Sequence, residues 1–276
     1  ISESTHSDLK LLISHGADVN ARNGEGASSL HFAAGDGSLS RMQVLCDAGA
    51  NIDVHSKSGA PIHWAAGKAR ADAIKFLIDR KADINAPSPE GLPAVIMASV
   101  SGCNEGVKYL VEAGADIGTL VSGNLTALHI CAEHGLDKAV EAMVATETGR
   151  KCCLIETADG NKPIHLAAMS EYRDIVRMLI SVSELSVEFT ELSGEAAVDA
   201  MIRDGAKRLD AWNAAHNAHK EDNTVALSPT ALSGDGAVED SIEEASEQHK
   251  AEAERFKDLG NSLFKTKAFS HAIEAY

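Results

Sequence analysis

The chain has 276 residues, which leaves room for one large domain, two smaller domains or an elongated array of repeats. Aromatic residues make up only 4% of the sequence, which favours helices packed through small residues over an aromatic-rich β-sandwich. The formal net charge of -16 excludes nucleic acid and anionic membrane surfaces as expected partners, because its long-range field repels both.

Cysteine usage and the chain ends bear on the cellular compartment. There are five cysteines, an odd number with no Cys-x-x-Cys pair, which favours a reducing environment. No apolar run approaches the roughly 20 residues that span a bilayer, and the N-terminal segment lacks the pattern of a secretion signal. We therefore expect a cytoplasmic protein without a membrane span, with the nucleus as the alternative compartment. The start at Ile1 and the end at Tyr276 inside a helical pattern indicate a fragment.

A repeat becomes visible when the chain is aligned on its histidines. Four segments share a histidine followed by small residues: SSLHFAAGDG (28–37), APIHWAAGKA (60–69), TALHICAEHG (126–135) and KPIHLAAMSE (162–171). A fifth copy, PAVIMASVSG (93–102), has Ile96 in place of the histidine. The successive steps of 32, 33, 33 and 36 residues give a period near 33.

A second landmark recurs in phase with the first. Its copies are LLISHGADVN (11–20), VLCDAGANID (44–53), FLIDRKADIN (76–85) and YLVEAGADIG (109–118). Small residues after each histidine predict a first helix, and apolar residues at i, i+3 and i+4 before the second landmark predict a second helix. Gly16, Gly49 and Gly114 then suit a left-handed residue at the end of the second helix. Lys81 replaces this glycine in one copy, at a cost of about 1 kcal/mol.

Polar segments between the units predict hairpin turns. They are NGEG (23–26), SKSG (56–59), SPEG (88–91) and DGNK (159–162). With these turns the units resemble ankyrin repeats, which carry Thr-Pro-Leu-His near their start and Gly-Ala-Asp-x-Asn near their end. The resemblance implies an all-α solenoid of stacked helix pairs with short hairpin turns, over roughly residues 9–183. Because the chain alters the Thr-Pro pair in every unit and adds three residues before the last one, we expect a less regular array.

The ankyrin resemblance also suggests how the array is divided. We expect a truncated repeat remnant at residues 1–22 and five repeats at residues 23–183. Since the remnant keeps only a second helix, the apolar face formed by Leu9, Leu12 and Ile13 should lack a partner helix of its own.

The repeating histidines are expected to be structural. In ankyrin repeats this histidine lies at the helix start and bonds backbone groups of the adjoining turn, and the resemblance implies the same role for His31, His63, His129 and His165. Spaced one repeat apart, their side chains would not converge on one site. The sequence has no phosphate-binding loop, nucleophile elbow or carboxylate pair. We therefore assign no catalytic or cofactor-binding residue and do not expect an enzyme.

Two cysteine groups leave other chemistry open. His129, Cys131 and His134 are metal-ligand residue types, but they lack the second half of a zinc site, and Cys131 occupies a core alanine position. Cys152 and Cys153 are adjacent and lie in the three-residue insertion, where a reactive pair is the alternative to inert thiols. We assign no metal site and prefer the structural interpretation of both groups.

A protein-binding surface follows from the resemblance alone. Ankyrin repeats bind proteins through their turn tips and the exposed ends of their first helices. The corresponding positions are Glu25, Asp36, Lys57, Lys68, Glu90, Ser101, Glu133, His134 and Met169. Their mixed polar character names no ligand, and ordinary solvated surface is the alternative interpretation for most of them.

The period is lost after residue 183, although helical spacing of apolar residues continues. Residues 184–220 are expected to form a helical cap that shields the last repeat from water. Residues 221–239 are poor in bulky side chains and rich in Ser, Thr, Asp, Gly and Pro, which predicts a flexible linker. A second domain is therefore expected to start near residue 240.

The segment 240–276 resembles the start of a tetratricopeptide (TPR) domain. Within it, ERFKDLGNSLFKTKAFSHAIEAY (254–276) alternates large residues with Gly260 and Ala272, which suits two antiparallel helices that cross closely. Lys257 and Asn261 match the first lysine and asparagine of the carboxylate-clamp class, which binds the acidic C-terminal tail of cytosolic heat-shock chaperones. Residues four apart share one helix face, so both could donate to carboxylates. A solvated lysine and a packing asparagine on a generic TPR domain is the alternative.

These patterns predict a protein-protein interaction scaffold with no cofactor. Its ankyrin repeats would bind a client or partner, and its TPR domain would bind a chaperone tail, as in a co-chaperone. One alternative is the targeting or assembly region of a larger enzyme or receptor. Another is a plain scaffold whose TPR domain binds internal peptides. The sequence leaves the oligomeric state open.

Overall fold

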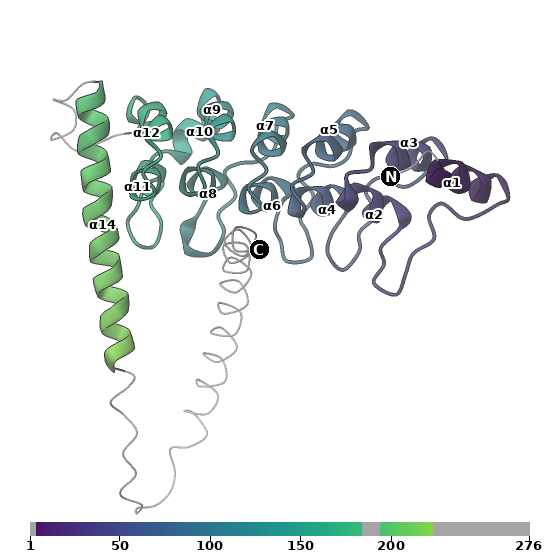
Figure 1. Cartoon of the computed structure of the whole chain (residues 1–276), viewed down its shortest axis with the longest axis horizontal. Helices are drawn as coiled ribbons and strands as arrows, with labels where there is room; N and C mark the ends of the chain where they lie inside the picture. Colours follow the sequence, from purple (N-terminus) through teal and green to yellow (C-terminus); the bar gives the residue numbers. More distant parts are fainter. Residues whose placement is uncertain (1–3, 184–193, 223–276) are drawn as a thin grey trace, which may run out of the picture. The chain divides into compact units, whose positions relative to one another are not determined.

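The computed structural model describes residues 4–183 and 194–222 (Figure 1). The chain divides into two compact units, residues 1–212 and 213–276, and the repeat array lies in the first. Every regular element in the described residues is helical, apart from isolated β-bridges in the hairpins. The prediction of an all-α repeat array is therefore confirmed. The expected TPR segment, 240–276, lies outside the described residues.

The array consists of helix pairs whose members form two rows (Figure 1). The first helices of the pairs are α2 (Ser29–Asp36), α4 (Pro61–Gly67), α6 (Ala94–Val100), α8 (Ala127–Glu133) and α11 (Pro163–Met169). The second helices are α3 (Leu39–Asp47), α5 (Ala71–Asp79), α7 (Asn104–Glu112), α9 (Asp137–Ala145) and α12 (Arg173–Ile180). Each helix contacts its partner in the pair and the next helix of its own row, as the period near 33 predicts.

Hairpin turns connect one unit to the next. Isolated antiparallel bridges close four of them: Arg22 with Ser28, Ser56 with Gly59, Pro87 with Pro93, and Val121 with Leu125. In a fifth, the backbone N–H of Thr157 donates to the carbonyl of Asn161 at 2.9 Å. The four predicted turns are confirmed. The turn at 121–125, which contains the short 3-10 helix η1 (Ser122–Asn124), was not predicted.

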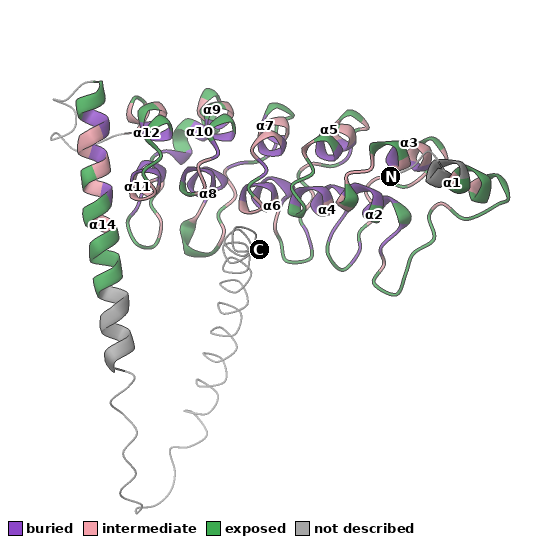
Figure 2. Cartoon of the chain, viewed as in Figure 1, coloured by how far each residue is buried: buried purple, intermediate pink, exposed green. Residues whose placement is uncertain are grey.

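The core lies between the two rows of helices, whereas the hairpins are mostly exposed (Figure 2). Ala33 and Ala34 in α2 are at most 1% exposed, because these small side chains let the backbone of α4 approach closely. Leu45 in α3 and Leu77 in α5 are equally buried and fill the space between the rows. Burial of such leucines stabilises the array by about 1.5–3 kcal/mol each.

Left-handed residues end the second helices, as predicted. Gly16, Gly49 and Gly114 have φ angles of 88°, 87° and 90°. Lys81 occupies the same place after α5 with a φ of 66°. A side chain with a Cβ is strained in this conformation, which is the physical reason for the cost predicted at Lys81.

The three extra residues before the last unit fold as part of an additional short helix, α10 (Glu147–Cys152). Thr146 caps it by accepting a hydrogen bond from the backbone N–H of Gly149 at 2.9 Å. A Cβ at Gly149 would lie 1.9 Å from the carbonyl oxygen of Met143, so glycine alone fits this position. The insertion is therefore packed into the array.

A long helix, α14 (Glu195–Asp222), covers the C-terminal side of the last pair (Figure 1). Its residues Ala197, Val198 and Met201 are buried. At Gly205 an added Cβ would lie 2.5 Å from the carbonyl carbon of Ala168, so the two backbones are in close contact. The helix extends two residues beyond the expected end of the cap, into the start of the predicted linker. Residues 184–193 lie outside the described part.

Ion pairs tie the start of α14 to α12. Arg173 lies 2.9 Å from Glu195 and 2.6 Å from Asp199, and Arg177 also pairs with Glu195 at 2.5 Å. All these side chains are substantially exposed, so solvent screens the pairs and their net contribution to stability is small. Apolar contact is therefore the larger source of α14 docking.

At the other end of the array, α1 (Ser4–Ser14) packs against α3. Leu11 and Leu12 are 58% and 60% exposed, whereas Leu9 packs against the core and Ile13 is half-buried. The prediction of an uncovered apolar face is thus correct for Leu12 and only partly correct for the other two. No helix in the described ranges combines the length and apolar character needed to cross a membrane.

Candidate protein-interaction surface

Histidines at the starts of first helices link one repeat to the next. The Nδ1 atom of His31 accepts a hydrogen bond from the backbone N–H of Ser28 at 3.0 Å. The Nε2 atom of the same ring lies 3.1 Å from the carbonyl oxygen of Gly59 in the following hairpin. Because Nδ1 accepts, the proton must be on Nε2, which then donates to that carbonyl. His31 therefore acts as a neutral clamp between two repeats.

Two further histidines repeat this arrangement. The Nε2 atom of His63 lies 2.9 Å from the carbonyl oxygen of Ala86, and that of His129 lies 3.1 Å from the carbonyl oxygen of Ile155. Their Nδ1 atoms accept from backbone N–H groups at their own helix starts. The expected structural role of these histidines is confirmed.

Burial keeps the histidine rings neutral. It lowers the pKa of His31, His63 and His129, because an imidazolium in the core would lose its hydration. The pKa of His165 falls to about 4, chiefly through burial and secondly through the positive charge of Arg208 on α14. These rings are therefore unsuited to general acid–base chemistry near neutral pH.

The third repeat lacks the clamp for a local reason. Its helix α6 begins after Pro93, which has no backbone N–H to donate. A histidine at position 96 would therefore have no donor for Nδ1. Ile96 stands there instead and is 2% exposed, so the third repeat is joined to the fourth by apolar contact at this point.

Other groups strengthen the junction between the third and fourth repeats. The thiol of Cys131 donates to the hydroxyl of Ser99 at 3.3 Å, and Nδ1 of His134 lies 3.3 Å from the carbonyl oxygen of Ser99. Burial raises the pKa of Cys131 to about 12, so the thiolate that a metal needs is disfavoured. His129, Cys131 and His134 thus have separate structural partners, and the described residues contain no cluster that could hold a metal ion.

The adjacent cysteines in the insertion are buried rather than presented to solvent. Cys152 and Cys153 are 1% and 0% exposed, and both are free thiols. Burial raises the pKa of Cys153 to about 11, and its thiol donates to the carbonyl of Gly149 at 3.3 Å. A reactive pair needs an accessible thiolate, so the geometry favours the inert interpretation.

The loops after the second helices form a ladder of hydrogen bonds. Backbone N–H groups donate to side chains one repeat earlier at 2.8–2.9 Å: Asn51 to Asn20, Asp83 to Asp53, and Asp116 to Asn85. The recurring Asp-x-Asn pattern thus has a structural function. Gly118 occupies the next position of this register and has no side chain to continue the ladder.

Three of the predicted surface residues lie at hairpin tips. Glu25, Lys57 and Glu90 are exposed. Neighbouring tips are joined, because the backbone N–H of Lys57 donates to the carbonyl of Glu25 at 2.9 Å. The first two tips therefore form a joined edge on which a partner could lie.

The predicted residues at the ends of first helices fall into two groups. Asp36, Lys68 and Glu133 are exposed, and Asp36 pairs with Arg41 at 2.7 Å. Ser101, His134 and Met169 are half-buried. The Ser101 hydroxyl donates to the carbonyl of Ala66 at 2.6 Å, and the ring of His134 contacts the third repeat as described above. Part of this second group is therefore engaged in holding repeats together.

Two aromatic residues that the sequence interpretation did not select also lie on this face. Phe32 in α2 is 47% exposed, and its ring centroid is 5.3 Å from that of Trp64 in α4, at an interplanar angle of 72°. Trp64 is half-buried, and its Nε1 atom donates to the hydroxyl of Ser56 at 3.1 Å. Both follow the clamp position, His31 or His63, directly. The position directly after each repeated histidine is therefore the sequence signal by which these two aromatic residues could have been found.

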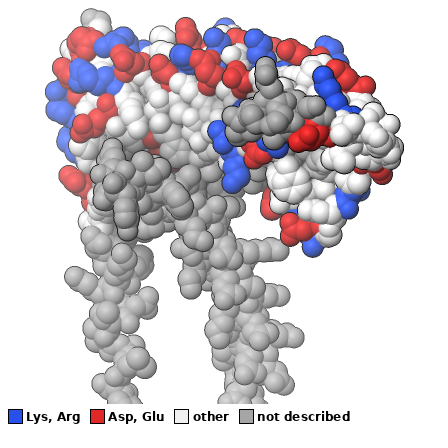
Figure 3. All heavy atoms as spheres, turned by 45° about the vertical axis from the view of Figure 1, so that its right-hand side comes forward, with Lys and Arg blue, Asp and Glu red and all other residues white. Residues whose placement is uncertain are grey.

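Basic side chains surround this aromatic pair. We call the combined set the aromatic–basic cluster, and it consists of Phe32, Trp64, Arg22, Lys57, Lys68 and Arg70. Figure 3 shows charges of both signs along the edge formed by the second helices, with a less charged surface below it. The cluster thus combines apolar area with one sign of added charge, a combination suited to protein recognition.

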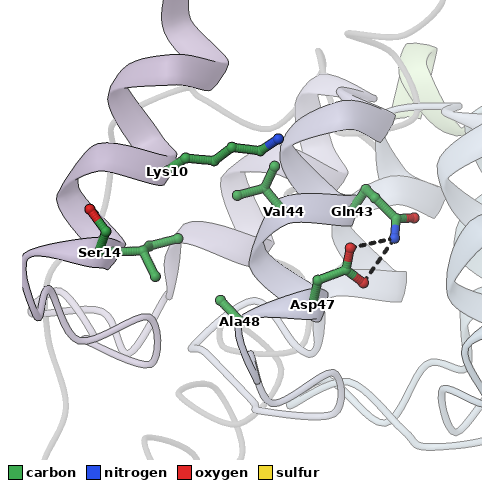
Figure 4. Close-up of a pocket in the computed structure, with 7 residues that line it drawn as sticks. Lys10, Ser14, Gln43, Val44, Asp47 and Ala48 are labelled. Carbon is green, nitrogen blue, oxygen red and sulfur yellow. Dashed lines mark hydrogen bonds between the residues drawn. The ribbon is translucent and has the colours of Figure 1, made fainter.

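A shallow hollow of about 350 Å³ lies between α1 and α3 (Figure 4). It is lined by Lys10, Ile13, Ser14, Gln43, Val44, Asp47 and Ala48. The amide of Gln43 donates to both carboxylate oxygens of Asp47 at 2.8 and 2.7 Å, so these polar groups satisfy each other. Most of the lining is exposed, which does not match the enclosed, apolar character of small-molecule sites.

The expected clamp residues of the second unit, Lys257 and Asn261, lie outside the described residues. The repeat array also matches a known protein family. The family model described as "Ankyrin repeats (3 copies)" matches residues 2–88, 55–120 and 94–190.

Proposed function

The chain belongs to the ankyrin-repeat family, and from that premise we propose that it acts as a co-chaperone-like adaptor. Ankyrin repeats are protein-interaction scaffolds, and the match covers well over half of the chain. The observation that carries the proposal is the exposure of the hairpin tips Glu25, Lys57 and Glu90, the first two of which are joined by a backbone hydrogen bond. In the proposed division of labour, this edge binds a client or partner protein, and the segment 240–276 contributes to binding a chaperone tail.

The division of labour rests on the character of the two parts. The array offers rigid, repeated elements, so a partner that binds it loses little entropy through ordering of the array. The segment 240–276 resembles a TPR domain, in which Lys257 and Asn261 would donate to carboxylates. Tethering both activities in one chain raises their effective concentration. We propose the cytoplasm as the compartment, since cytosolic chaperones are the proposed partners.

Site-specific photo-crosslinking tests the array part of the proposal. A photoreactive residue in place of Glu90 at a hairpin tip should capture a partner from extract of the native cells. The matched control is the same replacement at Glu112, which is exposed on α7 in the other row of helices. If both positions capture the same proteins equally, or neither captures any, the edge is not the binding surface.

Calorimetry on the full-length protein tests the chaperone part. The probe is a peptide with the acidic C-terminal sequence of a cytosolic heat-shock chaperone. Lys257→Ala should weaken binding by about 1.5–3 kcal/mol, because a charged hydrogen bond to carboxylate is lost. Lys207→Ala, an exposed lysine on α14, is the control and should leave the affinity unchanged. Equal affinity for both variants and wild type would reject the clamp assignment.

A further inference from the structure

We propose that the aromatic–basic cluster binds an acidic protein segment that carries a bulky apolar side chain. This inference rests on the proposed function, because it names the class of partner that the array would take. The cluster lies in the first two repeats, and the contacts of Trp64 and Arg70 within it were not expected from the resemblance to ankyrin repeats.

The aromatic half of the cluster combines the exposed Phe32 with the half-buried Trp64, and neighbouring groups hold Trp64 in place. The Trp64 ring contacts Phe32 on one side and the buried His31 on another, with centroids 5.3 and 5.5 Å away. Its indole N–H is already bonded to Ser56. An aromatic surface fixed in this way loses little side-chain entropy when a partner covers it. It can therefore serve as the apolar anchor of an interface.

Two glycines beside the anchor let large side chains pack closely against the first helices. Gly35 lies one turn after Phe32, and an added Cβ there would come within 3.4 Å of Cε3 of Trp64. Gly67 occupies the same register in α4, where an added Cβ would come within 3.3 Å of Met97. The indole ring and the Met97 side chain thus lie directly against glycine positions, and the exposed ring of Phe32 is the part of the anchor that a partner reaches first.

The cationic half of the cluster is tied to the same neighbourhood. Arg70 donates to the carbonyl oxygen of Gly35 at 3.2 Å, and Lys68 lies one helical turn after Trp64. Lys57 follows Ser56, which is the hydrogen-bond partner of the indole ring.

Arg22 completes the cationic half. It donates to the carbonyl oxygens of Gly26 and His55, one residue before Ser56. Four positive residues therefore belong to the turns and helix ends that adjoin the aromatic pair.

These cations lack carboxylate partners within the described residues. The ion pairs of the array involve other basic side chains. Of the nearby carboxylates, Asp36 is paired with Arg41 at 2.7 Å, and Glu25 and Glu90 lie at neighbouring hairpin tips. An acidic segment would find uncompensated positive charge here, and the attraction would raise its association rate. Charge complementarity thus selects an acidic partner.

The rest of the molecule argues for a protein segment over a nucleic acid. The net charge of -16 repels a phosphate backbone, which would have to extend beyond the cluster. Along the same face, Glu90 and Glu133 are exposed and would meet its next phosphates. A short acidic peptide can confine its charge to the cluster and insert an apolar side chain at Trp64.

Tryptophan fluorescence provides a direct test in the whole chain. The chain has two tryptophans, so Trp212→Phe leaves Trp64 as the only reporter. Four probes of equal length are titrated: a Glu-rich peptide with a central Leu-Phe, its Lys-rich counterpart, a Glu-rich peptide without apolar residues, and single-stranded DNA. The first should bind most tightly and change the Trp64 emission, and its affinity should fall with added salt.

Charge-reversal variants locate the site. Lys57→Glu and Lys68→Glu should each weaken binding of the first peptide by about tenfold or more. Lys207→Glu makes the same change in net charge on α14 and should have no effect. Phe32→Ala should also weaken binding of the first peptide. Because Phe32 is exposed, this variant should fold and still tests the site if a charge variant unfolds.

Several outcomes would overturn the inference. Equal binding of the Lys-rich peptide, tighter binding of DNA, or the same loss in Lys207→Glu as in Lys57→Glu would each do so. Sedimentation that shows a dimer dissolved by Lys57→Glu would mean that a second copy occupies the cluster. If peptide binding fails while crosslinking at Glu90 succeeds, the adaptor function stands and only the partner class is wrong.

Discussion

Pro93 has no backbone N–H, and this explains why Ile96, three positions later, replaces the histidine of the other repeats. In the other repeats a backbone N–H at the helix start satisfies the Nδ1 atom of the clamp histidine, for example from Ala60 to His63 at 3.1 Å. Proline removes that donor, and an isoleucine that needs no hydrogen bond takes the place of the histidine. The departure from the repeat pattern is thus a matched pair of changes.

This pairing can be tested by restoring the histidine. Ile96→His alone should destabilise the array by about 1–3 kcal/mol, because a buried ring nitrogen is left without a donor. Adding Pro93→Thr should recover part of the loss by supplying both the N–H and a capping hydroxyl. Urea denaturation of wild type, single and double variants gives the comparison. A double variant no more stable than Ile96→His would contradict this explanation.

The buried histidines predict a loss of stability on mild acidification. The folded-state pKa of His165, about 4, lies below its ordinary value of 6.5. The unfolded chain therefore takes up the proton first, so the contribution is complete above pH 6.5 and is lost as the pH falls from 6.5 towards 4. His31, His63 and His129, which link neighbouring repeats, have pKa shifts in the same direction.

The urea midpoint measured above pH 6.5 and at about pH 5 checks this prediction. The wild-type midpoint should fall, and it should fall less in His165→Gln, which has no ring to protonate. Carboxylates paired in the folded state, such as Glu195 with its lowered pKa, lose their contribution only at more acidic pH. Identical pH dependence in wild type and His165→Gln would contradict the assignment to this ring.

At the scale of elements, the close approach of α14 to α11 requires a glycine at position 205. Gly205 is buried, and a side chain there would collide with the backbone of Ala168 and Met169 in α11. The ion pairs of Arg173 and Arg177 lie at the opposite, N-terminal part of the contact. Close backbone contact and surface charge thus hold different parts of the same helix.

Gly205→Leu should therefore lift α14 from the array and cost about 1–3 kcal/mol or more, as in other overpacked cores. Hydrogen exchange should rise in α11, α12 and the first half of α14, and remain unchanged in α4 and α5. The matched control is Gly194→Leu, where an added Cβ meets nothing within 4 Å, although its positive φ adds a small strain. Exchange that rises equally throughout the array would argue against a local effect.

At the scale of the whole molecule, the two ends of the array differ. The C-terminal side is covered by α14, whereas α1 at the N-terminal side has no first helix of its own among the described residues. Leu12 and Leu45 occupy equivalent places in the repeat, yet Leu12 is 60% exposed and Leu45 is 2% exposed. The contribution of a leucine at this place to the stability of the array thus depends on whether neighbouring helices cover it.

Alanine substitutions at these two positions should separate the effects. Leu45→Ala should cost about 2–5 kcal/mol through loss of buried surface and formation of a cavity, whereas Leu12→Ala should change stability by less than about 1 kcal/mol. Thermal unfolding of both variants measures the difference, and hydrogen exchange should be fastest in α1. A cost at Leu12 as large as that at Leu45 would show that something covers it in solution.

The sequence alone determined the repeat, its helix pairs and the glycines that end the second helices. These features are local: a period, an apolar spacing and a left-handed residue can all be recognised in one dimension. It also identified the turns that carry Glu25, Lys57 and Glu90, because turns are marked by their own residue types, whereas the resemblance to ankyrin repeats suggested that these residues bind a partner.

Only the tertiary structure decided which polar residues are available to a partner. Ser101 and His134 looked like surface residues, but contacts with the preceding repeat engage them, and Cys152 and Cys153 were buried by the unforeseen helix α10. The cluster around Phe32 and Trp64 is assembled from two repeats whose side chains are 32 residues apart in sequence. Spacing fixes which units stack, but the side chains that meet between units depend on packing in three dimensions.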